Sequence, residues 1–442
     1  MSVLLVLLYC FCLDSGSATD TITSFQPIKD PNYIISNGSA FKLGFFSPVN
    51  STNRYLGIWF NKKSVLPAQW VANRDKPLKD SSGVLTISED GNLVLLNGQK
   101  EILWSSNVTN SSPNSSALLK DSGNLVLRES TTTGTIVWES FQNPSDTLLQ
   151  TMKLSTNVRT GKKVQFTSWK SPSDPSIGSF SAGIQAQSLV QVFLWRDGCP
   201  RWRSGPWNLG RFIGSVETDS VFHDGFSLSK DQDGTFYISF PYVSDSLFHY
   251  FLTTDGDIVE RYWDNDKDDW VVMWHALQSE CDIYGKCGEF GSCNPQTSPI
   301  CSCLAGFEPK STEEWNRGNW TSGCVRGTPL QCERVNTGGE AGKMDKFLKL
   351  NMMKVPDFAD LSSAPEENCR QQCIENCSCI AYASDSGAGC MSWTTSLIDT
   401  QKISSHGYDL YIRVAYSELG ELLCYLSKFY HMLQIIYCRS NC

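Results

Sequence analysis

The sequence predicts a fold dominated by β-strands and followed by small disulfide-rich modules. From Asp20 to about Thr160, apolar and polar residues alternate, and Gly, Asn, Asp and Ser recur between the runs, as in short strands joined by tight turns. Part of this region repeats itself. Further along, two sets of six cysteines crowd between Cys281 and Cys390. Modules this short cannot bury enough core without cross-links, so these cysteines are expected to form disulfides.

The N-terminus has the features of a secretory signal peptide. Met1 to Leu13 is almost wholly apolar, and the small residues Gly16 and Ala18 follow it. The apolar run is too short to span a bilayer. It departs from the usual signal peptide in lacking a Lys or Arg before the apolar residues. We therefore predict a signal peptide over residues 1–18, with cleavage after Ala18.

Composition narrows the function classes. The 442 residues are 19% charged and 12% aromatic, which is typical of globular material long enough for two to four domains. The formal net charge of −9 makes nucleic acid and anionic membrane surfaces poor partners. Because the longest apolar run is the N-terminal one, we expect no membrane insertion of the mature chain and a secreted, extracellular protein.

Asn-x-Ser/Thr sequons are frequent, and with a signal peptide they indicate a glycosylated surface. One at Asn376 is doubtful because its middle residue, Cys377, is expected in a disulfide. The predicted N-glycosylation sites are Asn37, Asn50, Asn107, Asn110, Asn114 and Asn319.

The internal repeat predicts a β-prism. Asp90–Leu95 followed by Trp104 recurs as Gly123–Leu127 followed by Trp138, at the spacing of one supersecondary unit. A looser third copy is expected to end at Ile58-Trp59. Each unit then contributes one large Trp to a shared centre, and three such sheets around an aromatic core form a prism.

The cysteine spacing leaves several pairings open. Six cysteines alone allow about 15 pairings, and zinc is the main competing interpretation of clustered cysteines. Paired CxxC knuckles and nearby His partners are missing, which favours disulfides. Cys369, Cys373 and Cys377 have helical spacing, so these sulfurs are expected on one side of a short helix pinned to a sheet.

Several segments resemble a known plant family. Four are similar to the bulb-type lectin domain of S-domain receptor-like kinases and S-locus glycoproteins: Leu43–Pro48, Tyr55–Trp59, Trp70–Asp75 and Trp138–Phe141. Thr167–Pro175 and Arg201–Asn208 look like the S-locus glycoprotein region, which in that family forms a second lectin-like β-domain. The two cysteine sets then resemble an EGF-like module and a PAN/apple module, so the resemblance covers nearly everything from Asp20 to Ser417.

The resemblance implies an all-β-dominated architecture in which only the PAN/apple domain adds a short helix on a sheet. The implied parts are a signal peptide (1–18), a bulb-type lectin domain (19–156), an S-locus glycoprotein domain (157–277), an EGF-like module (278–330), a PAN/apple domain (331–416) and a divergent tail (417–442).

The family pattern also implies the disulfides. In the EGF-like module it joins Cys281 to Cys293, Cys287 to Cys301 and Cys303 to Cys324. In the PAN/apple domain it joins Cys369 to Cys390 and Cys373 to Cys379, which leaves Cys332 to pair with Cys377. Cys199 has no assigned partner, and we favour a partly buried free thiol over an intermolecular bridge.

Catalysis is not expected, and neither is a cofactor or a metal. The kinase Gly-rich loop, HRD and DFG motifs are missing, as is a G-x-S-x-G elbow. The five histidines, at positions 223, 249, 275, 406 and 431, do not stand at metal-ligand spacing from one another. The acidic run Asp264–Asp269 lacks the Gly and the later Glu of an EF-hand, and a solvated turn between strands is preferred.

Sugar binding is the serious chemical alternative. Bulb-type lectins bind mannose through Q-x-D-x-N-x-V-x-Y, and here Asp90, Asn92 and Val94 match while Ser88 and Leu96 replace Gln and Tyr. A hydroxyl left without its partner costs about 1–3 kcal/mol, so both losses together would erase a weak affinity. The second copy fits worse. Turn residues that cap a prism edge are the preferred reading over a carbohydrate-binding site, and both remain open.

The tail after Ser417 does not continue the resemblance. Its apolar residues follow a short heptad-like rhythm, which fits either an amphipathic helix or unselected sequence after an early stop. Cys424, Cys438 and Cys442 would then be unpaired or cross-linking.

The function implied is that of a secreted recognition glycoprotein. In the family, such ectodomains act in pollen recognition and self-incompatibility or in related cell-surface sensing, by binding secreted cysteine-rich peptide or protein ligands and by dimerising. The chain could pair with a full-length S-domain receptor kinase or act as a decoy. Its binding surface is expected from Trp195 to Trp207, with the equally weighted alternative that these are core and turn residues. The alternatives are a mannose-type lectin and a fragment of a full-length receptor serine/threonine kinase, which would lie at the cell surface.

Overall fold

A computed structural model describes most of the chain between Asp20 and Glu418, in the ranges 20–62, 68–109, 112–129, 134–208, 211–214, 226–240, 247–334, 344–385 and 389–418. Strands dominate these ranges, which confirms the predicted fold class. The predicted signal peptide, the glycosylation site Asn110 and the tail cysteines lie outside the described residues. Within those ranges, no helix is long and apolar enough to cross a membrane.

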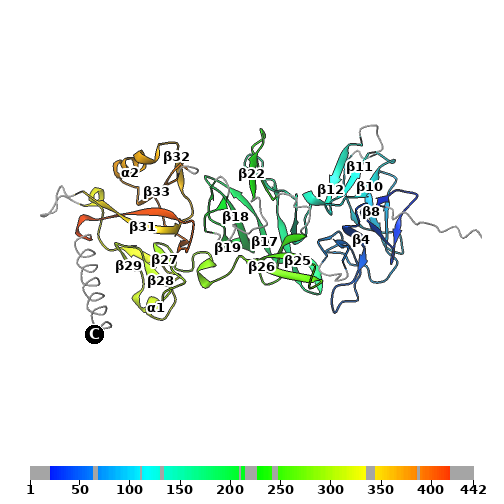
Figure 1. Cartoon of the computed structure of the whole chain (residues 1–442), viewed down its shortest axis with the longest axis horizontal. Coiled ribbons are helices and arrows are strands. Elements are labelled where there is room, and N and C mark those ends of the chain that lie inside the picture. Colours follow the sequence, from blue (N-terminus) through cyan, green and yellow to red (C-terminus); the bar gives the residue numbers. More distant parts are fainter. Residues whose placement is uncertain are drawn as a thin grey trace, which may run out of the picture. The chain divides into compact units, whose positions relative to one another are not determined.

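The described residues divide into two compact units. The first unit runs to Asn143 and also holds Pro172–Ser176, and the second holds the remaining residues. Figure 1 colours the first unit blue to cyan along the sequence and the second from there to red.

The first unit is a β-prism of three four-stranded antiparallel sheets. Each sheet joins one of the first three strands to three strands that follow one another along the chain, so the N-terminal segment ties all three together. The sheets are β1(Thr21–Ile22)-β10(Ser116–Leu119)-β11(Leu125–Arg128)-β12(Ile136–Glu139), β2(Ile28–Lys29)-β7(Val84–Ile87)-β8(Leu93–Leu96)-β9(Ile102–Ser105) and β3(Tyr33–Ile35)-β4(Phe41–Phe46)-β5(Tyr55–Phe60)-β6(Trp70–Val71).

Three tryptophans meet at the centre of this prism. Trp70, Trp104 and Trp138 lie at equal intervals of 34 residues in the sequence. Their ring centroids are 5.6, 6.0 and 5.5 Å apart, edge to face, an arrangement that aromatic quadrupoles favour. The prediction that Trp59 supplies the third ring is wrong. In β5 the inward position belongs to the fully buried Ile58, opposite Trp70, so Trp59 points to the other face and packs against Phe46.

The second unit begins with another prism of three four-stranded sheets. They are β13(Thr147–Leu149)-β24(Phe248–Leu252)-β25(Ile258–Asp264)-β26(Asp269–His275), β15(Lys163–Val164)-β14(Leu154–Asn157)-β23(Thr235–Ser239)-β22(Ser227–Lys230) and β16(Phe166–Ser171)-β17(Asp174–Ala186)-β18(Val190–Arg196)-β19(Cys199–Arg203). A two-stranded ribbon, β20(Trp207–Asn208) and β21(Arg211–Phe212), follows.

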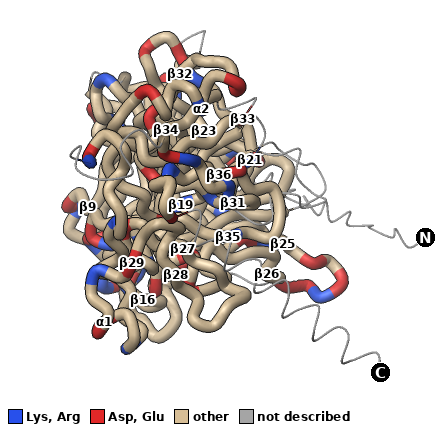
Figure 2. Tube along the Cα trace, turned by 90° about the vertical axis from the view of Figure 1, so that its left-hand side faces the viewer, with Lys and Arg blue, Asp and Glu red and all other residues tan. Residues whose placement is uncertain are grey.

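The tip of the β25–β26 hairpin carries the acidic run Asp264–Asp269. The Asp264 carboxylate accepts hydrogen bonds from the backbone of Asp266 and Lys267 and pairs with the Lys267 ammonium at 3.1 Å. Figure 2 shows this mixture of acidic and basic residues at the hairpin tip. The run is therefore the turn between strands that the sequence favoured.

An eight-stranded sheet completes the second unit and crosses the predicted boundary between the EGF-like and PAN/apple modules. Its order is β28(Cys301–Cys303)-β27(Gly291–Cys293)-β35(Thr400–Lys402)-β31(Lys346–Lys354)-β36(Tyr408–Val414)-β33(Ala381–Asp385)-β34(Gly389–Trp393)-β32(Asp360–Ser362). β27 runs parallel to β35, so the EGF-like strands extend the PAN/apple sheet. Outside this sheet lie the pair β29(Phe307–Pro309) and β30(Cys324–Arg326), and α1(Thr312–Asn316), which Ser311 caps.

Disulfides fix these small modules, and their pairs are those that the family resemblance implied. Helix α2(Glu366–Glu375) buries Cys369 and Cys373 against β33 and β34, as the cysteine spacing predicted. The prediction is wrong for Cys377, which lies in a turn after the helix and is exposed. The Cα atoms of each pair are 5.2–5.8 Å apart: Cys281–Cys293, Cys287–Cys301, Cys303–Cys324, Cys332–Cys377, Cys369–Cys390 and Cys373–Cys379.

Candidate functional site

The Asp90–Asn92 turn between β7 and β8 is tied internally. The Ser88 hydroxyl lies within hydrogen-bond distance of the Asp90 carboxylate and of the Asn92 carbonyl, and the backbone N–H of Asn92 donates to Asp90 Oδ1 at 3.2 Å. Gly91 supplies the left-handed backbone of the turn, with φ of 80°. Hydrogen bonds from Ser88 and then from Asn92 hold the pKa of Asp90 below its usual value.

Hydrogen bonds of the Asn92 side chain connect this turn to the segment that follows β9. Its Oδ1 accepts from the Ser106 hydroxyl at 2.8 Å and from the Val108 backbone at 2.7 Å, while its Nδ2 donates to Asp90 and to the Val108 carbonyl. These four bonds use the full capacity of the amide. Val94 is only 2% exposed, which places it in the core. Carbohydrate binding by Asp90, Asn92 and Val94 therefore stays a prediction, and Asp90 alone of the three is exposed.

Similar hydrogen bonds are present in the second copy of the repeat, around Asn124. Asn124 Oδ1 accepts from the Ser140 hydroxyl at 3.2 Å and from the Phe141 backbone at 3.3 Å. The Leu125 backbone donates to that hydroxyl, as the Leu93 backbone does to Ser106. Each serine stands two residues after a central tryptophan. This spacing could have indicated a structural role for Asn92 and Asn124.

The predicted binding surface from Trp195 to Trp207 divides into core and exposed parts. Trp195 and Trp202 are buried, while residues 196–200 form the exposed β18–β19 hairpin tip. Asp197 and Gly198 take left-handed backbone angles there, which suits a tight hairpin turn. The guanidinium groups of Arg196 and Arg201 lie 5.8 and 5.6 Å from the Phe180 ring centre.

Cys199 lies on this hairpin and is exposed, so the expectation of a partly buried thiol is wrong. It stands at the start of the edge strand β19, where pairing with Arg196 closes the hairpin and covers little of the side chain. Among the described cysteines, it alone is outside a disulfide.

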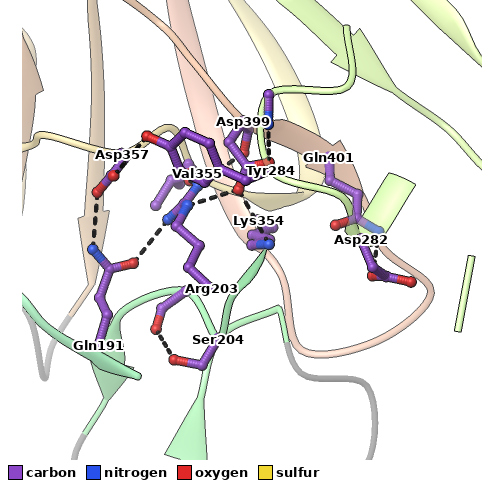
Figure 3. Close-up of polar contacts among 12 residues, drawn as sticks. Gln191, Arg203, Ser204, Asp282, Tyr284, Lys354, Val355, Asp357, Asp399 and Gln401 are labelled. Carbon is purple, nitrogen blue, oxygen red and sulfur yellow. Dashed lines mark hydrogen bonds and ion pairs between the residues drawn. The ribbon is translucent and has the colours of Figure 1, made fainter. Parts of the chain in front are cut away.

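Sequence reasoning missed a buried ionic cluster within the second unit (Figure 3). Arg203, on β19, is 1% exposed. Its Nε donates to Asp399 Oδ2 at 2.7 Å, Nη1 donates to Gln191 Oε1 at 2.9 Å, and Nη2 donates to the carbonyls of Val355 and Asp399 at 2.6 and 2.8 Å. The Lys354 ammonium lies 3.2 Å from the same Asp399 carboxylate oxygen. We call these residues the Arg203 cluster.

Further hydrogen bonds connect the Arg203 cluster to the EGF-like module. Asp357 accepts from Gln191 Nε2 at 3.0 Å and from the Tyr284 hydroxyl at 2.9 Å, and the Gly285 backbone donates to Asp399 at 3.0 Å. The cluster thus joins the second prism to the EGF-like and PAN/apple modules. Its partners are up to 196 residues apart in sequence, so no local pattern could have announced it.

Burial and neighbouring charges act in opposite directions on the Arg203 cluster. Burial alone would raise the pKa of Asp399, but Lys354 and Arg203 outweigh it and hold that pKa below its usual value. Burial lowers the pKa of Lys354, and Arg203 adds to this effect. Removing the one carboxylate would leave two buried cations facing each other, which is costly.

The described histidines lie in different surroundings. His249, on β24, is fully buried, and burial followed by the charge of Arg261 lowers its pKa to about 3. It therefore stays neutral at physiological pH. His275 Nδ1 lies 2.9 Å from Asp257 Oδ2 at the surface. His223 and His431 lie outside the described residues.

The described glycosylation candidates are all exposed, as carriers of a bulky glycan must be. They are Asn37, Asn50, Asn107, Asn114 and Asn319. Asn376 is exposed as well, but the middle residue of its sequon, Cys377, is paired with Cys332.

Three protein-family models match the chain: a D-mannose binding lectin over residues 68–170, an S-locus glycoprotein domain over 202–311 and a PAN-like domain over 332–400. A G-type lectin S-receptor-like serine/threonine-protein kinase of Arabidopsis thaliana is 45% identical, and its relative SD1-13 is 43% identical. Each alignment covers 94% of this chain and 51% of the relative, so the chain spans about half the length of these curated relatives.

Among solved structures, the two-domain Scilla campanulata agglutinin is 14% identical, with a TM-score of 0.18 over 61% of this chain and 86% of that chain. The domain matches and the names of the relatives agree in kind. The chain therefore belongs to the S-domain family, whose bulb-type lectin, S-locus glycoprotein and PAN-like domains it carries in that order.

Proposed function

We propose that this chain is the ligand-recognition part of an extracellular S-domain sensor and that it binds a secreted cysteine-rich peptide or protein. The observation that carries the proposal is the β18–β19 hairpin tip, where Arg196 and Asp197 are exposed above a rigid prism. Arginine is enriched at the energetic centres of protein interfaces, and a tight hairpin presents it with little loss of conformational entropy.

The proposed role is recognition without catalysis, in pollen recognition, self-incompatibility or related surface sensing. Exposed sequon asparagines and buried disulfides suit an extracellular protein. A chain of this kind could bind the ligand of a full-length receptor kinase as a decoy, or pair with such a receptor.

Affinity capture tests the proposal. The immobilised chain would be loaded with plant extracellular fluid and eluted first with mannose and then with acid, and both eluates would be identified by mass spectrometry. The test variant is Arg196→Glu, and the matched control is Arg159→Glu, an exposed arginine on a different hairpin of the same prism. Each captured peptide would be synthesised and its Kd measured against the three proteins.

We expect a peptide or receptor ectodomain in the acid step, with binding weakened roughly tenfold or more by Arg196→Glu, as for an interface centre. Equal binding to both variants would contradict the hairpin as the recognition surface. Glycoproteins that mannose releases, and that an Asp90→Ala chain fails to retain, would favour the mannose-type lectin instead.

A further inference from the structure

A cavity of about 270 Å³ lies within the second unit, where three parts of the chain meet. The second prism contributes Trp202 and Trp274 to its wall, the EGF-like module contributes Asp282 and Gln296, and the PAN/apple module contributes Gln401 and Ser404. Gln296 and Ser404 are exposed, so they mark the side that solvent reaches. The cavity is distinct from the hairpin tip and from the Asp90 turn.

Two buried polar groups of this wall lack hydrogen-bond partners. Gln401 is 4% exposed, and its Nε2 donates to Asp282 Oδ1 at 3.2 Å (Figure 3). Because an ionised carboxylate only accepts, the amide must face Asp282 with its nitrogen, which leaves Oε1 as an unpaired acceptor. The indole Nε1 of Trp274 is an unpaired donor. Buried polar groups are normally satisfied, so these two indicate a missing partner.

Gln401 Oε1 needs a donor, and Trp274 Nε1 needs an acceptor. Hydroxyl groups can serve either atom, since a hydroxyl both donates and accepts. The rest of the lining adds amide side chains at Gln278, Asn294 and Gln296. Together with the indole rings, these groups suit a compact molecule that has several hydroxyls and apolar C–H faces.

Charge argues against the other ligand classes. Lys402, the one lysine of the lining, donates its ammonium to the Asn351 carbonyl. The single lining aspartate, Asp282, is engaged by Gln401 and by the Ser279 backbone and hydroxyl. An anion would meet this carboxylate, and a metal ion would find too few oxygen ligands. The cavity also falls below the usual ~300–1,000 Å³ of sites for drug-sized ligands.

The Arg203 cluster packs against one part of the cavity wall, at Gly214. A Cβ on the lining residue Gly214 would lie 2.6 Å from Lys354 Cγ, so only glycine lets the buried lysine stem pass there. Lys354 is fixed in turn by Asp399. A wall fixed in this way is preorganised and loses little entropy when a ligand binds.

We infer that this cavity is a binding site for a neutral sugar unit of a glycan, formed jointly by the second prism, the EGF-like module and the PAN/apple module. This site is separate from the Asp90 turn and from the proposed peptide surface, so its failure would leave the recognition of a peptide untouched.

Isothermal titration of the full chain tests the inference with three neutral probes: methyl α-mannoside, cellotetraose and chitotetraose. Ser404→Trp and Gln296→Trp would fill the cavity from exposed positions on two different modules. Trp274→Phe would remove the indole donor and keep an aromatic ring. The matched control is Gln371→Ala, an exposed glutamine on α2.

We expect at least one probe to bind, with binding weakened more than tenfold by each filling variant, roughly two- to tenfold by Trp274→Phe as for one lost hydrogen bond, and unchanged by Gln371→Ala. Failure of all three probes would overturn the inference. So would equal binding to the filled variants, or binding that is abolished by Asp90→Ala and survives in Ser404→Trp. Unchanged peptide capture by the filled variants would show that the two sites are independent.

Discussion

In the first prism Trp70, Trp104 and Trp138 meet at the centre, with every pair of rings 5.5–6.0 Å apart, whereas at the corresponding strands of the second prism two tryptophans meet. Trp202 on β19 and Trp274 on β26 lie 6.0 Å apart, edge to face. The strand connections correspond in two of the three sheets, because β13 joins β24–β26 as β1 joins β10–β12, and β16–β19 follow one another as β3–β6 do. The third sheet differs, because β15-β14-β23-β22 joins two hairpins, whereas β2-β7-β8-β9 joins one early strand to three consecutive strands.

The residues opposite these rings differ as well. Trp138 pairs across the strands with Leu127, while Trp274 pairs with Glu260, and both central strands have a register shift directly after that residue. The second prism also has an apolar cavity of about 60 Å³, which Trp202 and Trp274 both line. The sequence repeat of the first prism is visible because its central rings are alike. The second prism has other residues at the corresponding positions, including the buried carboxylate of Glu260.

The most direct test of this comparison removes one equivalent ring from each prism. Trp70 and Trp202 each lie on the last strand of their sheet, where they pair with Ile58 and Leu194 of the neighbouring strand. The two tryptophans are 6% and 4% exposed. We expect Trp70→Ala to cost about 3–5 kcal/mol. Trp202→Ala should cost roughly 1–2 kcal/mol less, because a ring beside a cavity has fewer atoms in contact to lose.

Hydrogen exchange of the strands in each prism measures the two losses separately, since a chain of two units need not unfold in one step. Wild-type exchange in the unmutated prism is the internal control. A loss at Trp202 as large as that at Trp70 would mean that the second centre is as tightly packed as the first.

The Arg203 cluster belongs to the second unit alone, and Asp399→Ala breaks it. Arg203 and Lys354 would then be buried without their carboxylate, at a cost of about 3–5 kcal/mol. Asp409→Ala is the matched control, because it breaks the surface pair between Lys349 and Asp409 in the same unit, for which roughly 0–1 kcal/mol is expected. Thermal unfolding by calorimetry compares them. Similar shifts of Tm for both variants would refute a structural role of the cluster.

His249 makes the stability of the second prism depend on pH. Its pKa is about 3 when folded and about 6.5 when unfolded. The folded state therefore excludes a proton that the unfolded chain takes up. The contribution of the neutral His249 to the free energy of unfolding is complete above pH 6.5. It falls by about 1.4 kcal/mol for each pH unit between 6.5 and 3.

The replacement His249→Leu should remove this part of the acid sensitivity. Denaturant unfolding at pH 7.0 and 4.5 measures it, with the exposed His275→Leu as the control. A pH dependence that persists unchanged in His249→Leu would assign the effect to other groups.

How far the sequence could predict the molecule follows from the range of each interaction. Period-two alternation and the Trp104/Trp138 repeat are local, so the first prism was predictable. The prediction of Trp59 as the third ring was wrong because the strand before Trp70 also carries a tryptophan, one residue before its end. The disulfides followed from a family resemblance. The Arg203 cluster joins segments far apart in sequence. The Gln401 oxygen is unpaired because the folded chain places Asp282 beside the amide nitrogen of Gln401, and the two residues are also far apart in sequence. Such features arise only from the tertiary fold.

The smallest expected effect concerns the charge at the centre of the second prism. Burial and then the charge of Glu260 raise the pKa of Tyr250 well above its usual value. The variant Glu260→Gln keeps the shape of the side chain and removes the charge. We expect the Tyr250 pKa to fall but to stay above its usual value, because burial is the larger cause, with less than about 1 kcal/mol change in stability. Ultraviolet titration of the phenol follows it, with Tyr250→Phe identifying the signal. A pKa that returned fully to its usual value would mean that solvent enters this centre.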